Sequence, residues 1–251
     1  VPTDFSHIPV REAASDVAEA VGIRRGYRFS GTERGFLLEQ FLSQQTETAN
    51  WFGDNSYVFS TTDYDDLKNG IDAVIEWEPE NADEQVPRLA VDFTTSGSSD
   101  GIATKLEKIS LGGRVKYFRS EAETDEEGNP KEQSLARLPV VILGLDTELF
   151  ASLASVVAGA RMETKKRDPV TNQLTTVVGF KPSVLADQPI KALLLEQARA
   201  QLLKQRSNPQ AVACLGYVEM ELDKIKGSPE YRKALVIGKR SPTHRGLTLA
   251  G

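Results

Sequence analysis

The chain has 251 residues, of which 39% are hydrophobic and 26% are charged, and its net charge is −6. This composition is that of an ordinary globular protein with material for one large or two modest domains. No run approaches the roughly 18 apolar residues of a membrane span. The only cysteine, Cys214, excludes an intrachain disulfide and fits the reducing cytoplasm, where we expect the protein.

Charge is distributed unevenly along the chain. Residues 1–160 hold 14 Lys and Arg against 28 Asp and Glu, whereas residues 161–251 hold 16 against 8. A basic C-terminal third beside an acidic N-terminal part is typical of a protein that acts on a polyanion. A solvated helical face would give the same counts, so both interpretations stay open.

Two amphipathic helices are predicted before residue 43. The first covers residues 10–21. A helix-start signal, Ser30-Gly31-Thr32, precedes the second, whose apolar residues recur at helical spacing. Glu39 lies beside the apolar stripe of this second helix, either as a partly exposed acid or as a ligand.

Two short apolar strands follow, over residues 70–77 and 88–95, and we single out one aspartate in each. Mostly apolar runs with β-branched residues are typical of strands that are covered on both faces. An ionised carboxylate in such a strand is costly unless a cation or strong donors satisfy it. If the strands are neighbours, Asp72 and Asp92 together suggest a divalent metal.

The elements after the second acid strand alternate between helix and strand. A helix containing Lys105 leads to a Gly-Gly pair and a strand over residues 114–118. Residues 121–134 form the most polar tract and are predicted as a mobile surface loop. A strand over residues 138–145 and a helix over residues 148–160, capped by Asp146, complete this part.

The C-terminal third begins with a predicted hairpin over residues 161–182. Helices are expected over residues 192–205 and 210–226, and the remaining tail as a strand or extended segment. The first arm of the hairpin carries Lys165, Lys166 and Arg167. These cations could contact the phosphates of DNA, giving affinity without sequence specificity. Lysines that protect an exposed strand edge are an equally good explanation.

The order of elements over residues 32–145, with Gly70-Ile71-Asp72 in one strand and Val91-Asp92-Phe93-Thr94 in the next, resembles the PD-(D/E)XK nuclease superfamily. The resemblance covers roughly residues 30–160. It implies an α/β fold of the restriction-endonuclease-like type, with a central mixed β-sheet flanked by helices. To this core the chain would add a hairpin and a helical C-terminal extension.

The resemblance also implies a site. Asp72 would be the first motif acid and Asp92 the second, and Glu39 would match the acid that this family often carries on its first helix. In the family these acids bind Mg²⁺ or Mn²⁺. Hard divalent ions take oxygen ligands and keep several waters, so two or three converging carboxylates suffice.

The sequence departs from the family where a lysine stands two positions after the second acid. Thr94 occupies that position, and a hydroxyl can orient water but supplies no positive charge. Lys105 on the following helix is the first candidate to replace the lysine, and Lys116 on the next strand is the second. If neither reaches the acids, the fold has lost nuclease activity.

The leading hypothesis is a metal-dependent nuclease that hydrolyses phosphodiester bonds, with DNA as the expected partner, no membrane association and a homodimer left open. Residues 1–30 would be a helical lead-in, residues 31–160 the nuclease-like core, and residues 161–251 a basic extension packed on it.

Two alternatives stay open. An inactive relative could bind nucleic acid or protein. In an unrelated α/β fold, Asp72 could cap a turn after Gly70, and Asp92 could close a buried polar network with Thr94, Thr95 or Arg88.

Overall fold

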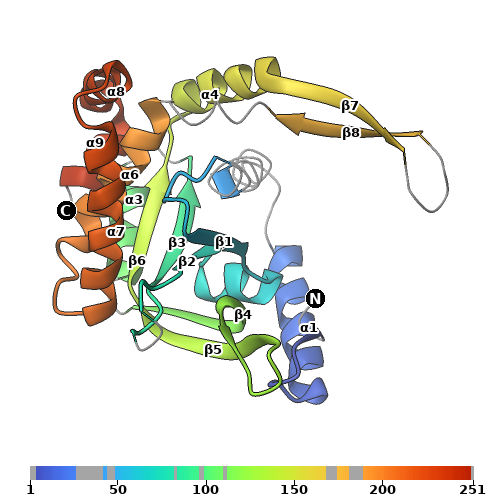
Figure 1. The fold of residues 1–251 in the computed structure, drawn as a ribbon. Coiled ribbons are helices and arrows are strands. Elements are labelled where there is room, and N and C mark those ends of the chain that lie inside the picture. Colours follow the sequence, from blue (N-terminus) through green and yellow to red (C-terminus); the bar gives the residue numbers. More distant parts are fainter. Residues whose placement is uncertain are drawn as a thin grey trace.

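In the described part of the computed structural model, the central sheet has four strands in the order β1-β2-β3-β6 (Figure 1). They are β1 (Ser56–Ser60), β2 (Ala73–Trp77), β3 (Arg88–Thr94) and β6 (Val140–Gly144). β2 is antiparallel to both β1 and β3, whereas β6 is parallel to β3. The predicted α/β class, with a mixed sheet flanked by helices, is confirmed.

The structure describes residues 4–26, 42–43, 49–81, 84–95, 99–109, 112–167, 174–180 and 189–249. The first predicted helix is α1 (Val10–Gly26). Most of the second, including Glu39, lies outside the described residues. None of the described helices is both long and apolar enough to cross a bilayer.

Helices cover one face of the sheet. Every residue of β2, β3 and β6 is buried, as expected for strands with both faces covered. The main hydrophobic core lies between this face and three helices, α4 (Thr147–Ala160), α6 (Pro189–Leu202) and α7 (Pro209–Ile225). Cys214 of α7 is fully buried in this core.

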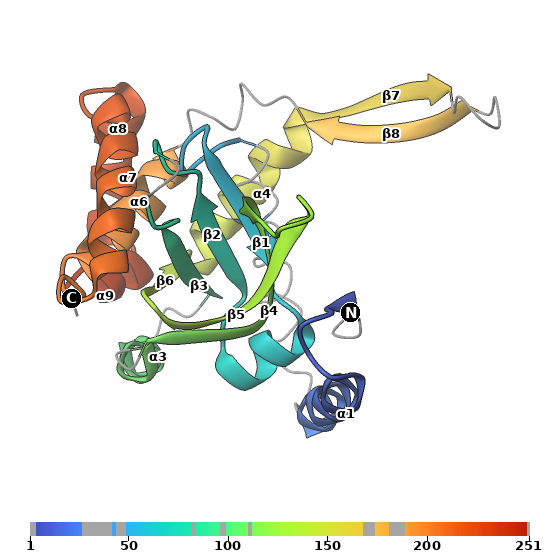
Figure 2. The ribbon, with the colours of Figure 1, turned by 60° about the horizontal axis from the view of Figure 1, so that its bottom comes forward.

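The opposite face is covered by a long hairpin and one helix. The hairpin strands β4 (Gly113–Thr124) and β5 (Pro130–Leu138) cross the sheet and enclose a second apolar cluster (Figure 2). Beside them, α3 (Ser99–Ile109) packs Ile102 against Ile142 of β6. The side chain of Asp92 belongs to this face.

A second hairpin is formed by β7 (Arg161–Arg167) and β8 (Leu174–Phe180), which pair antiparallel as the sequence predicted. Figures 1 and 2 show this arm leading away from the sheet beyond the end of α4.

The prediction of a mobile loop over residues 121–134 was wrong. Most of this tract belongs to β4 and β5, and the turn between them is closed by the carboxylate of Asp125, which accepts backbone N–H groups of Glu127 and Asn129 at 3.0 and 2.8 Å. Polar strands that project beyond a core lack the apolar alternation by which strands are recognised.

The prediction of an extended C-terminal tail was also wrong, because the tail forms α8 (Pro229–Arg240) and α9 (Pro242–Leu249). Ser228 caps α8, accepting the N–H of Tyr231 at 3.0 Å. Ser241 precedes α9 and accepts the N–H of His244 at 3.2 Å. A Ser-Pro pair is a helix-start signal, since Pro suits the first helical position.

The outer edge of β6 is closed by a ladder of three glutamines. Each side-chain amide accepts a backbone N–H of β6 and donates to the carbonyl of the same residue. Gln197 pairs with Gly144 at 2.9 and 3.0 Å, Gln201 with Ile142 at 2.9 and 2.8 Å, and Gln205 with Val140 at 3.2 and 2.7 Å. Four residues of helix rise about 6.0 Å, close to the roughly 6.6 Å of two strand residues. The spacing therefore lets a helix substitute for a missing neighbouring strand.

Replacing Gln201 by Leu should lower the free energy of unfolding by about 3 kcal/mol, because it leaves a buried N–H and a buried C=O of Ile142 unpaired. Urea unfolding of the wild type and Gln201→Leu measures the change. The matched control is Gln85→Leu at an exposed position, where we expect less than about 0.5 kcal/mol. Equal effects of the two substitutions would show that the ladder contributes nothing.

Candidate metal and phosphate site

Asp72 and Asp92 are brought together by the pairing of β2 with β3. Ala73, the first residue of β2, pairs with Val91, and the N–H of Asp72 donates to the carbonyl of Val91 at 2.9 Å. The regular register ends at Ala73, because opposite residues of an antiparallel pair bond to each other, whereas the N–H of Asp72 bonds to Val91 and not to Asp92. The two aspartates are related by the cleft that both of them line.

Both aspartates open into one cleft of about 660 Å³, which lies between the ends of the two strands, α3 and the base of the β4–β5 hairpin. The charged residues that line the cleft are Asp66, Lys68, Asp72, Asp92, Lys105, Arg114 and Arg137. Acids and cations therefore share the same hollow, as recognition of a phosphate together with a metal ion requires.

Lys105 reaches the second acid from α3. Its Nζ donates to Oδ1 of Asp92 in an ion pair, and the Asp92 side chain is 11% exposed. The first acid is held by the backbone, since the N–H of Phe93 donates to Oδ2 of Asp72 at 2.6 Å. Thus, of the two lysines considered as replacements, Lys105 stands beside the acids.

The other candidate lysine is bound elsewhere. Lys116 pairs with Glu12 at 2.6 Å and with Asp16, both on α1. Thr94 is buried and is not among the residues that line the cleft. Its role with the attacking water stays a prediction, as do the nucleic-acid contacts of Lys165, Lys166 and Arg167, which lie on β7.

A short π-helix, η2 (Asp65–Asn69), turns two successive acids to different sides. Asp65 is fully buried and accepts the backbone N–H groups of Lys116 and Tyr117 at 2.8 and 3.1 Å, which ties η2 to β4. Asp66 instead lines the cleft. π-Helical turns occur often at functional sites.

Asp66 brings a third carboxyl group to the cleft. Its side chain is in hydrogen-bond contact with that of Asp72, burial raises its pKa, and the charge of Asp92 raises the pKa further. Two carboxyl groups in such contact must share a proton or a cation. Asp66 was not among the residues predicted from the sequence, although the adjacent acids before Gly70 were a signal for it.

The donor set fits a hard cation, because the cleft offers carboxylate oxygens and no thiolate or imidazole. Within the described part of the chain, no group of three or more His, Cys, Asp or Glu side chains is arranged to hold a metal ion. Mg²⁺ is commonly held by only one or two carboxylates together with waters and substrate phosphate. The fit therefore rests on Asp72 and Asp92.

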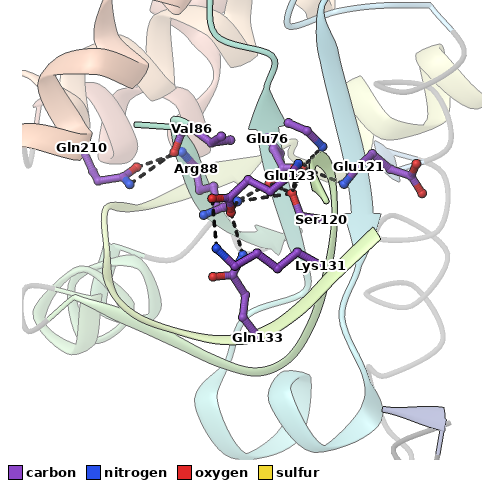
Figure 3. A network of polar contacts seen from close by, with 10 residues as sticks. Glu76, Val86, Arg88, Ser120, Glu121, Glu123, Lys131, Gln133 and Gln210 are labelled. Carbon is purple, nitrogen blue, oxygen red and sulfur yellow. Dashed lines mark hydrogen bonds and ion pairs between the residues drawn. The ribbon is translucent and has the colours of Figure 1, made fainter. Parts of the chain in front are cut away.

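A separate buried network shows what acids with a structural role look like in this fold (Figure 3). Glu76 is fully buried and accepts Nε of Arg88 at 2.6 Å, the hydroxyl of Ser120 and two backbone N–H groups. Arg88 also donates to Glu123. The guanidinium of Arg88 thus donates to Glu76, Ser120 and Glu123, and the alternative that Arg88 closes a network with Asp92 stays a prediction.

Comparisons of the chain with protein-family models, with curated proteins and with solved structures found no match.

The network of Figure 3 predicts a pH dependence of stability. Burial would raise the pKa of Glu123, but hydrogen bonds from Arg88 and Gln133 outweigh it and lower the pKa to about 2. A carboxylate with a lowered pKa stabilises the fold above its unfolded pKa, and this contribution is lost as the pH falls toward the folded pKa. Glu123→Gln should therefore be less stable by up to about 3 kcal/mol at neutral pH.

Urea unfolding between pH 2 and pH 7 measures this difference. The difference in unfolding free energy between the wild type and Glu123→Gln should narrow below pH 4.5 and be small near pH 2, where the carboxyl group is protonated in the unfolded state and half protonated in the folded state. Glu126→Gln in the exposed turn is the control, with little expected change at any pH. A gap that stays constant over the whole range would contradict the assignment.

Proposed function

We propose that the chain is a metal-dependent nuclease of the restriction-endonuclease-like fold, which hydrolyses phosphodiester bonds in nucleic acid, with DNA as the first candidate. The observation that carries the proposal is that Asp72, next to the start of β2, and Asp92 of β3 line one cleft, where Lys105 forms an ion pair with Asp92.

The topology supports the proposal. Three antiparallel strands are followed by α3 and then by β6, which returns parallel to β3. A mixed sheet flanked by helices, with the acids near the end of two adjacent strands, is the arrangement that the PD-(D/E)XK resemblance implies. The β4–β5 hairpin is an insertion between α3 and β6 that forms one wall of the cleft.

Asp72 and Asp92 would hold Mg²⁺ or Mn²⁺ through their carboxylate oxygens. When bound, such an ion supplies a water of lowered pKa and neutralises charge that develops on the phosphate. Burial raises the pKa of Asp66, and the charges of Asp63 and Asp92 raise it further, so a divalent cation in the cleft would favour its ionised form.

Lys105 would take the part of the motif lysine, reaching the second acid from a helix instead of from the same strand. Its amine is compact and carries three donors, so it can orient a water or a non-bridging phosphate oxygen. The packing of α3 keeps Lys105 near Asp92. Ile102 of α3 packs against Ile142 of β6, and Ile142 is paired with Asp92 of β3.

A second candidate function is a nucleic-acid-binding module without catalysis. It is favoured by the ion pair itself, since Lys105 already neutralises Asp92. In that case the acids serve to hold α3 against the sheet, and no divalent ion binds.

A cleavage assay tests the proposed activity. With Mg²⁺ or Mn²⁺ the wild type should cut DNA, and Asp92→Asn should reduce the rate by at least about 100-fold because a metal ligand and its charge are lost. Lys105→Met should reduce the rate by about 100-fold or more, as loss of a transition-state donor does. The matched control, Asp223→Asn on the exposed surface of α7, should cut like the wild type. Cleavage by Asp92→Asn at the wild-type rate would remove this residue from the mechanism.

Calorimetric titration with Mn²⁺ separates the two functions without a substrate. The nuclease proposal expects saturable binding that Asp72→Asn and Asp92→Asn each abolish, because each removes one carboxylate from a set of few ligands. Asp223→Asn should bind like the wild type. Absence of Mn²⁺ binding by the wild type would favour the binding module.

A further inference from the structure

The strand β5 contains a bulge at Arg137, at the edge of the cleft. Gly113 pairs with Leu138 and Arg114 with Ala136, so Arg137 is an extra residue on its strand. Its φ is 58°, in the left-handed region that residues other than glycine rarely occupy. A β-bulge re-aims side chains, and bulges are frequent beside active sites.

Three neighbouring residues accommodate this conformation. Gly112, with φ 81°, lies against the bulge, and a Cβ added to it would stand 3.2 Å from Cα of Arg137. At Gly113 an added Cβ would meet Cγ2 of Val140 at 2.8 Å, so the strand can cross the sheet here only without a side chain. Asn208 donates to the carbonyl of Arg137 at 3.0 Å. Strained backbone that its surroundings enforce in this way is concentrated at functional sites.

Arg137 lines the cleft at the bulge, and Arg114 of β4 lines it too. Both side chains are exposed. The arginine ion pairs among the described residues are those of Arg24, Arg88, Arg119 and Arg199, so neither cleft arginine is neutralised by a described carboxylate. Guanidinium groups bind phosphate oxygens well. Two arginines beside the two acids therefore suit a nucleic-acid backbone, in which each phosphate is followed by another.

We propose that Arg137, assisted by Arg114, binds a backbone phosphate of the nucleic acid that neighbours the phosphate at Asp72 and Asp92. The inference rests on the proposed function for the class of ligand, but it concerns binding and does not need cleavage. Arg137 would be a positioning residue that fixes which phosphate of the nucleic-acid strand lies at the acids. Because it contacts phosphate and no base, it would give no sequence specificity.

The test is fluorescence anisotropy with a labelled mixed-sequence DNA duplex, titrated at several NaCl concentrations in EDTA, where a metal-dependent nuclease does not cut. Arg137→Asn removes the charge, and Asn tolerates the left-handed conformation. Arg137→Lys keeps the charge, and Arg114→Gln changes the assisting residue in a regular strand. Arg232→Asn, on the exposed surface of α8, is the matched control. Melting temperatures show that each variant is folded.

For the wild type we expect binding that weakens with salt. Arg137→Asn should lower the magnitude of the slope of log K against log salt by about 0.9, the value for one phosphate contact. Arg137→Lys should restore the slope, and Arg232→Asn should leave it unchanged. A folded Arg137→Asn with the wild-type affinity and slope would overturn the inference, as would a wild type that does not bind the duplex. A chain that binds through Arg137 and never cleaves would refute the nuclease and leave this inference standing.

Discussion

The glutamine ladder on β6 is the constraint on which the position of the candidate site depends. Asp92 of β3 stands opposite Ile142 of β6 in the parallel pair, and Ile142 is the residue whose N–H and C=O are both held by Gln201. A shift of α6 by one turn would therefore displace β6, and β3 pairs with β6. The ladder fixes β6 relative to α6, and β6 in turn supports β3, which carries Asp92. The described residues of the C-terminal third thus help to position the cleft without lining it.

The acids of this fold differ in how completely protein donors satisfy them. Glu76 is fully buried and receives an arginine, a hydroxyl and two backbone amides, which accounts for its charge without any ligand. Asp65 is similarly paired with the backbone of β4. The acids of the cleft also have protein partners, since Asp72 accepts the N–H of Phe93 and Asp92 pairs with Lys105. They differ from Glu76 and Asp65 in that three carboxyl groups line one cleft, where Asp66 and Asp72 are in hydrogen-bond contact. A cation in this cleft would favour the ionised form of all three.

Much of this arrangement could be predicted from the sequence. The apolar runs located β2 and β3, and the pairing of these two strands as neighbours brings Asp72 and Asp92 to one cleft. The sequence could not predict that Asp65 is buried while Asp66 lines the cleft. This difference depends on how the π-helix η2 orients its side chains, and a π-helix has no reliable sequence signal. Arg137 was missed for a related reason. A bulge shifts strand register by one residue, and its signal, the two glycines on the partner strand, resembles an ordinary turn.

The ladder also has a consequence for the nascent chain. Gly144 and its partner Gln197 are 53 residues apart in sequence, so at about 5 to 20 residues per second the ribosome makes β6 several seconds before α6 exists. During that interval the four-stranded sheet has an apolar strand with an open hydrogen-bonding edge, the type of surface that recruits strands from other chains. Productive folding therefore requires that the open edge of β6 pairs with no other chain until the glutamines of the ladder have been synthesised. Conditions that slow translation between residues 144 and 197 should favour aggregation over the native state.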